Sequence, residues 1–359
     1  MRLARGGSFA PSGLGVSIPD THGSRPFDRL RAGCGLHSGA ASRLLLVVLW
    51  LFAPVLFGQN LLLLKSITVP PNAAVRSAAI SPKGNLVAAA CKDGQVRVWS
   101  FPGGELRQAF DLKDQRVTGV WFSYDGTLLA AGGNRGAVRI WGLPSGKLKS
   151  ELNVGAAVVT LAISPDRSLL AVAPAGVPAQ LWDLDVGRVL TELPPKFAGS
   201  AAVAFSPDGK WLASADEDTV IRIYEAQTGA LRASSDDLLL ETFAIAFSAD
   251  SKYLYAGGPD KTISVVDVAS GKVARAFPKQ SFVVGALQLS HDGKYLAAAY
   301  LDEKSFNNPA PVMVWDLAAQ SVRSTIQPNF TPNGGGFLPD GRLLLTSSAE
   351  GKLQVWAVK

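Results

Sequence analysis

Seven copies of one pattern, spaced about 42 residues apart, restrict the fold of this chain more than any other feature of its sequence. The clearest copy, residues 206–235, opens with the turn Ser206-Pro-Asp-Gly209, then has an apolar run, an acidic loop and the β-branched and aromatic stretch 219–224. Proline second and glycine fourth suit a type I turn, and the two runs that follow have the composition of strands. A small apolar strand precedes the turn. Each copy therefore predicts four short antiparallel strands joined by tight turns.

The spacing of the copies predicts a ring of blades. The positions equivalent to Gly209 are separated by steps of 42, 41, 42, 42, 42 and 48 residues; they are Gly84, Gly126, Arg167, Gly209, Ser251, Gly293 and Gly341. A period of about 40–45 residues with four strands per period is the signature of a β-propeller. We therefore predict an all-β, seven-bladed propeller of four-stranded antiparallel blades. Its innermost strands are expected at 75–80, 117–122, 158–163, 200–205, 242–247 and 284–289.

The two ends of the repeat region predict how the ring closes. Only three residues follow Trp356, so the seventh copy has three strands and no fourth. Residues 62–69 lie ahead of the first copy, at the place where the other copies keep their fourth strand. We predict that this N-terminal strand pairs with residues 353–358 and completes the last blade, which leaves no long sheet edge open.

The third strands carry a resemblance to a known family. The motifs at 93–99 (DGQVRVW), 220–224 (VIRIY) and 313–316 (MVWD) look like the third-strand motif of WD repeats, and the resemblance covers about residues 62–359. The family's Gly-His dipeptide before the first strand is absent from every copy, so its Asp–His–Ser/Thr–Trp hydrogen-bond network is not expected in full. The fifth copy, 252–277, is also similar to propeller repeats of bacterial surface-layer proteins.

The residues ahead of the repeats have a different composition. Residues 1–43 are rich in Gly, Ser, Pro and Arg, and we interpret them as a disordered leader or an over-extended start. The apolar run that follows Arg43 is too short for a comfortable membrane span and suits the hydrophobic region of a signal peptide, 44–58. The propeller domain is then 61–359. We expect an exported protein, whether periplasmic, cell-surface or secreted; an uncleaved signal, anchoring it to the membrane, is the alternative.

Charge argues against a nucleic-acid partner. The chain has 35 basic and 29 acidic residues, but six arginines and two acidic residues belong to residues 1–58. The repeats therefore have 29 basic and 27 acidic residues, scattered rather than gathered in a basic stripe. We expect no nucleic-acid binding.

The loops between the second and third strands should lie on the same face as the loops that join successive blades. We call this the loop face, and the opposite one, with the turns of Ser-Pro-Asp-Gly type, the turn face. Function concentrates on varied loops over a rigid scaffold. The loop face is therefore our predicted partner-binding surface, and its candidate residues are Arg76, Lys92, Arg116, Arg135, Lys196, Lys261, Phe282, Phe306 and Phe330.

Signals of catalysis or metal binding are weak. Carboxylates recur six residues before the third-strand aromatic position, at Asp93, Asp218, Asp260 and Glu350. We interpret them as acceptors of backbone N–H groups in tight turns rather than as a cation site. His291 is the only histidine of the repeats, and no G-x-S-x-G, H-E-x-x-H, P-loop or C-x-x-C motif is present. We therefore predict no catalytic residues, metal ligands or cofactor.

The leading hypothesis is a non-enzymatic, exported scaffold that binds a protein or peptide. The alternative is an enzyme, or a cofactor- or metal-binding propeller, with a small-molecule site in the central channel. A purely structural role at the cell surface is hinted at only by the fifth copy.

Overall fold

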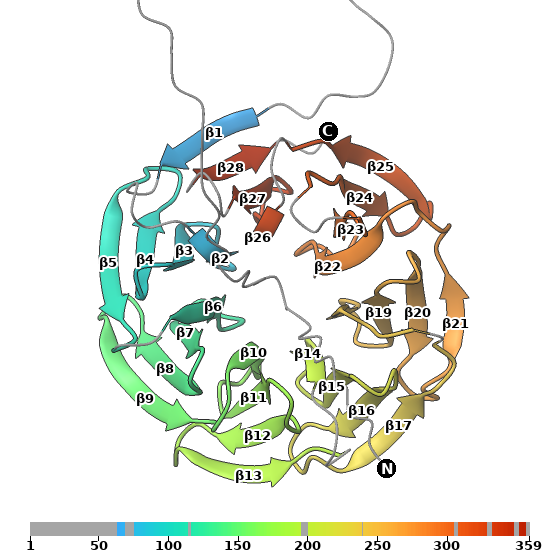
Figure 1. Cartoon of the computed structure of the whole chain (residues 1–359), viewed down its shortest axis with the longest axis horizontal. Coiled ribbons are helices and arrows are strands. Elements are labelled where there is room, and N and C mark those ends of the chain that lie inside the picture. The colour runs from blue at the N-terminus through green and yellow to red at the C-terminus, as the bar shows by residue number, and fades with distance from the viewer. Residues whose placement is uncertain are drawn as a thin grey trace, which may run out of the picture. The chain divides into compact units, whose positions relative to one another are not determined.

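The computed structural model describes residues 63–68, 75–113, 116–194, 200–238, 240–304, 308–328, 332–347 and 352–356. The predicted leader and signal segment lie outside these residues. The described residues form seven four-stranded sheets, in each of which neighbouring strands pair antiparallel. Figure 1 shows the sheets arranged around a centre, like the blades of a wheel.

Six of the sheets consist of four consecutive strands each. Blade 1 consists of β2 (Val75–Ile80), β3 (Leu86–Cys91), β4 (Gln95–Ser100) and β5 (Leu106–Asp111). Blade 2 consists of β6 (Val117–Phe122), β7 (Leu128–Gly133), β8 (Ala137–Gly142) and β9 (Lys147–Asn153). Blade 3 consists of β10 (Val158–Ile163), β11 (Leu169–Pro174), β12 (Gln180–Asp183) and β13 (Arg188–Glu192).

The next three blades follow the same order. Blade 4 consists of β14 (Ser200–Phe205), β15 (Trp211–Asp216), β16 (Ile221–Glu225) and β17 (Leu231–Ser235). Blade 5 consists of β18 (Ala244–Phe247), β19 (Tyr253–Gly257), β20 (Ile263–Asp267) and β21 (Val273–Ala276). Blade 6 consists of β22 (Val283–Leu289), β23 (Tyr295–Leu301), β24 (Val312–Asp316) and β25 (Ser321–Ile326).

The last sheet is composite. Its strand order is β1-β28-β27-β26, with bounds β26 (Pro332–Phe337), β27 (Leu343–Ser347), β28 (Lys352–Trp356) and β1 (Leu63–Thr68). The predicted count of seven blades is therefore corrected: six blades consist of four consecutive strands, and the last sheet instead takes its outer strand, β1, from the N-terminal side. The pairing expected between 62–69 and 353–358 is observed between β1 and β28, with Ser66 opposite Gln354.

The innermost strands make a closed circuit. Each contacts the innermost strand of the blades on both sides, in the order β2, β6, β10, β14, β18, β22, β26 and back to β2. In Figure 1 these strands lie nearest the centre, and the outer strands β5, β9, β13, β17, β21 and β25 form the circumference. Without the β1–β28 pairing, the last sheet would lack its outer strand and β28 would present an open edge.

The core lies between blades rather than on one face of a single sheet. Both faces of a blade are covered by neighbours, so β7 and β11 are buried at every position. One inter-blade cluster joins Val96 and Val98 of blade 1 to Val120, Leu129 and Trp141 of blade 2. The Phe110 ring of β5 stacks on Trp141 with centroids 4.6 Å apart, which couples the outer strand of one blade to the next. Cys91 is a buried free thiol.

Candidate functional site

A buried serine closes the turn between the first and second strands in six blades. In blade 4, Ser206 Oγ accepts a hydrogen bond from Trp211 N at 2.9 Å and donates one to Asp208 Oδ1 at 2.6 Å. Asp208 Oδ1 also accepts the backbone N–H of Lys210 at 3.1 Å. Gly209, at φ 71°, takes the left-handed conformation that the turn requires. The equivalent serines are Ser81, Ser123, Ser164, Ser248 and Ser290.

The arrangement, which we call the Ser–Asp clasp, holds the carboxylate ionised. Burial alone would raise the pKa of Asp208, but the hydrogen bonds from Ser206 and the Lys210 N–H, with the Lys210 charge, outweigh it and lower the pKa. The pKa of Asp250 is lowered foremost by the hydrogen bond from Ser248, and that of Asp292 by the one from Ser290. The clasp thus uses the side chains of the turn face for structure.

A second polar cluster surrounds Asp216 at the end of β15. Its side chain is buried and accepts hydrogen bonds from Ser200 Oγ, from Ser214 Oγ at 3.0 Å and from Arg222 Nη1 at 2.7 Å. Burial raises the pKa of Asp216 although these hydrogen bonds oppose the rise. Arg222 also holds Asp218 through both nitrogens, at 2.9 and 2.7 Å. These partners all belong to blade 4, so the cluster joins its first three strands.

The third-strand aromatic residues find local partners in place of the missing histidine. Trp182 Nε1 donates to Gln180 Oε1 at 3.0 Å, and Trp315 Nε1 donates to the Tyr300 hydroxyl at 3.3 Å. The Tyr224 hydroxyl donates to the carbonyl oxygen of Pro194. These three blades therefore satisfy the polar atom of the ring with different partners, whereas Trp356 Nε1 of the last sheet is buried without one among the described residues.

The recurring turn carboxylates are structural where the structure describes them. Asp93 accepts Gln95 N at 3.1 Å, Asp218 accepts Val220 N at 3.3 Å and Asp260 accepts Thr262 N at 3.2 Å. The interpretation as backbone acceptors is therefore confirmed for these three; Glu350 lies outside the described residues. In the described part of the chain, no group of three or more His, Cys, Asp or Glu side chains is placed to hold a metal ion.

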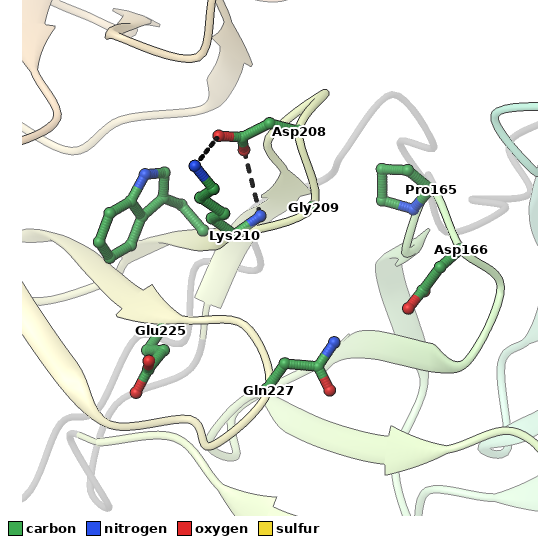
Figure 2. Close-up of a pocket in the computed structure, with 8 residues that line it drawn as sticks. Pro165, Asp166, Asp208, Gly209, Lys210, Glu225 and Gln227 are labelled. Carbon is green, nitrogen blue, oxygen red and sulfur yellow. Dashed lines mark hydrogen bonds and ion pairs between the residues drawn. The ribbon is translucent and has the colours of Figure 1, made fainter.

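A cavity of about 420 Å³ opens on the turn face between blades 3 and 4. Figure 2 shows Asp166 and Pro165 of one blade facing Asp208, Lys210, Glu225 and Gln227 of the other. Asp166 and Asp208 are engaged in Ser–Asp clasps, and Glu225 accepts a hydrogen bond from Thr228. Since its carboxylates are engaged within their own turns, we assign this cavity no ligand.

A smaller cavity, of about 260 Å³, includes His291. It lies between blade 6 and the composite last sheet, also on the turn face, where the Arg323 guanidinium sits 4.8 Å from the Tyr295 ring centroid. His291 occupies the second position of its turn and is exposed. Among the residues of this cavity, Ser290 donates its hydroxyl hydrogen to Asp292 Oδ1 at 2.7 Å and is therefore engaged in a Ser–Asp clasp.

The structure describes six of the nine predicted partner-binding residues. Lys92 and Arg135 are exposed in the turns after β3 and β7, and Lys261, in the turn after β19, pairs with Glu303 of blade 6 at 2.7 Å. Phe282 is half-buried against the core cluster of blades 5 and 6, so packing accounts for much of its ring. Lys196, Phe306 and Phe330 lie outside the described residues.

The remaining two, Arg76 and Arg116, lie at the loop-face ends of neighbouring blades. Arg76 is the second residue of β2, whose first residue, Val75, pairs with Cys91 just before the Lys92 turn. Arg116 precedes β6 and is fixed by Asn134, whose side chain accepts its N–H at 3.0 Å and whose N–H donates to its carbonyl at 3.0 Å.

A family comparison connects this architecture to its sequence. The model described as WD domain, G-beta repeat matches residues 63–100, 104–142, 197–225 and 241–267. The first match begins with the outer strand β1 and the second just before the outer strand β5. Each ends with the last residue of the third strand of the following blade, β4 or β8. The chain carries WD40 repeats. A WD40 repeat of this chain is thus offset by one strand from a blade, which is why the first repeat contributes β1 to the last blade.

The WD40 matches do not cover every blade. Blades 3 and 6 fall outside them yet have the same four-stranded order, and the last blade is matched only through β1. No curated protein matches the sequence significantly. Within the described ranges, no helix has the length and apolar character of a membrane span.

Proposed function

We propose that this protein is a non-enzymatic scaffold that binds another protein or a peptide through its loop face. WD40 propellers commonly serve as protein-interaction scaffolds, which supports the class of function. Residues of the second and third strands are buried between blades, and polar side chains of the turn face are hydrogen-bonded within Ser–Asp clasps. The observation that carries the proposal is that cationic side chains from separate loops, those of Lys92, Arg116 and Arg135, are exposed together over blades 1 and 2.

Capture of a partner by the immobilised protein tests the face. The partner is identified by mass spectrometry and then re-tested with the double variant Lys92→Glu/Arg135→Glu. Arg188→Glu, which reverses an exposed charge on the outer strand β13, is the matched control. We expect the control to keep the partner and the double variant to lose it. Equal capture by all three proteins would place the binding surface elsewhere.

We further propose that the scaffold acts after export. The support is the apolar run at 44–57, with Arg43 before it, which has the length and flank of a signal peptide. N-terminal sequencing of the mature protein from the extracellular or periplasmic fraction tests this. A mature chain beginning near residue 59 agrees with the proposal, whereas residues 1–40 in the mature chain contradict it.

A further inference from the structure

Charge is unevenly divided over the loop face. The turns between second and third strands carry Lys92 in blade 1 and Arg135 in blade 2, and the one carboxylate there, Asp93, is paired with Arg97 at 2.6 Å. The same turns in blades 4, 5 and 6 carry five carboxylates. Asp218 is paired with Arg222 and Glu303 with Lys261, so Glu217, Asp260 and Asp302 remain in excess over Lys304. An anionic partner is therefore attracted to one sector of the face and repelled by the other.

Arg76 and Arg116 lie at the inner margin of the basic sector. They stand at the loop-face ends of β2 and β6, which are neighbouring innermost strands. Asn134 fixes the backbone of Arg116 beside the turn that carries Arg135, and β2 places Arg76 beside the turn that carries Lys92. Four cationic side chains from two blades thus border one part of the loop face.

Neither arginine is neutralised by the described part of the protein. Arg97, Arg139 and Arg222 each hold a carboxylate at 2.6 or 2.7 Å. In contrast, the side chains of Arg76 and Arg116 make no ion pair or hydrogen bond with any described residue, and Arg76 Nε is buried without a partner. Burial, and then the charge of Arg116, lower the pKa of Arg76, so the two like charges act on each other.

Within the described residues, an unpaired buried N–H and two guanidinium groups without a carboxylate partner are costly. A buried donor without an acceptor costs about 1–3 kcal/mol, and like charges repel. A carboxylate placed between the two arginines would supply the counter-charge, because guanidinium and carboxylate match in a bidentate geometry.

We propose that Arg76 and Arg116 anchor an acidic peptide segment, rich in Asp or Glu, with Lys92 and Arg135 at the edge of its site. The inference rests on the proposed function and adds the chemical class of the partner. The carboxylates of blades 4 to 6 confine the acidic segment to blades 1 and 2.

Fluorescence anisotropy with labelled peptides tests the site. The probes are a Glu-rich peptide, a Lys-rich peptide of equal length and a single-stranded oligonucleotide. We expect the full protein to bind the Glu-rich peptide, and Arg76→Ala and Arg116→Ala each to weaken that binding about tenfold, the loss of one charge-assisted contact. Arg188→Ala should leave it unchanged. Added salt should weaken binding of the Glu-rich peptide, because the Debye length falls to about 3 Å at 1 M salt and the attraction between charges is then screened.

Each other outcome overturns a defined part of the inference. If both arginine variants bind the Glu-rich peptide as tightly as the unchanged protein, Arg76 and Arg116 do not anchor it. Preference for the Lys-rich peptide rejects the acidic class but leaves the loop-face scaffold standing, because the capture experiment tests that face independently. Arginine-dependent preference for the oligonucleotide rejects a peptide as occupant. Circular dichroism establishes that each variant is folded; should Arg76→Ala not fold, Arg76→Lys keeps the charge, loses the bidentate geometry and should still weaken binding.

Discussion

Removing one hydroxyl from the Ser–Asp clasp of blade 4 should destabilise the whole ring measurably. Ser206 is fully buried, and Ser206→Ala removes the 2.6 Å hydrogen bond to Asp208 and leaves the Trp211 N–H without its acceptor. A hydrogen bond to a charged group contributes about 1.5–3 kcal/mol, and an orphaned buried donor costs about 1–3 kcal/mol. Water reaches Asp208, whose side chain is 36% exposed, so we expect a loss of about 2–3 kcal/mol.

Urea denaturation followed by circular dichroism measures this loss as a shift in midpoint at constant slope. Ser270→Ala is the matched control, since Ser270 Oγ also donates to a carboxylate, Asp267, at 2.7 Å but in an exposed turn. Water replaces that bond, so the control should lose less than about 1 kcal/mol. Equal losses in the two variants, or no loss in Ser206→Ala, would mean that burial does not strengthen the contribution of the clasp to stability.

The same variant also tests how the stability of the fold depends on pH. The folded-state pKa of Asp208 is lowered because hydrogen bonds from Ser206 and the Lys210 N–H outweigh the effect of burial. A lowered carboxyl pKa contributes stability above the unfolded-state pKa, about 4, and the contribution is lost as pH falls through the folded-state value. The stability gap between wild type and Ser206→Ala should therefore be full at neutral pH and shrink below about pH 4. A gap that widens on acidification would contradict the assignment.

Two further substitutions test the interior. Arg222→Ala leaves the buried Asp216 without its cation and should lower the free energy of unfolding by about 3–5 kcal/mol. Adding Asp216→Asn to that variant should recover part of the loss. A denaturant midpoint that does not recover would contradict the pairing. Gly132→Ala places a methyl group 2.6 Å from Val158 Cγ1 of the next blade and should cost about 1–3 kcal/mol by the same assay. Gly142→Ala is its control, because a Cβ there has no neighbouring atom nearer than 3.6 Å. Equal losses of stability in the two variants would contradict close packing between blades at Gly132.

Periodicity allowed much of the fold to be predicted from sequence. The innermost strands β2, β6, β10 and β14 have the predicted bounds, because apolar alternation and the turn that follows define both ends. The fifth differs: 242–247 was predicted, but β18 begins at Ala244. There the Glu241 carbonyl oxygen approaches Gly258 so closely that a Cβ at Gly258 would lie 2.1 Å from it. Such a backbone contact cannot be recognised from the periodic pattern of the sequence.

The polar clusters were harder to predict. The serine of the clasp recurs three residues before six of the seven turn anchors, so the signal was present in the sequence. Proline and glycine alone are nevertheless enough to predict the turn. Asp216 gave no signal, because its partners Ser200, Ser214 and Arg222 meet it only after three strands have paired. Topology placed Arg76 and Arg116 on the loop face, whereas their lack of partners is a property of three-dimensional packing.

Closure of the ring through β1 is the claim on which the blade order and both faces depend. Ser66 and Gln354 are opposite one another in the β1–β28 pairing, and opposed residues of antiparallel strands have Cα atoms about 4.5–5.5 Å apart, within the range of a disulfide. Cysteines at these two positions, with Cys34 and Cys91 replaced by alanine, can be scored by mobility on a non-reducing gel. We predict nearly complete cross-linking of this pair and little for Ser66→Cys with Lys352→Cys, two residues out of register. Absence of the Ser66–Gln354 cross-link in the folded protein, or equal yields from the two pairs, would contradict the closure.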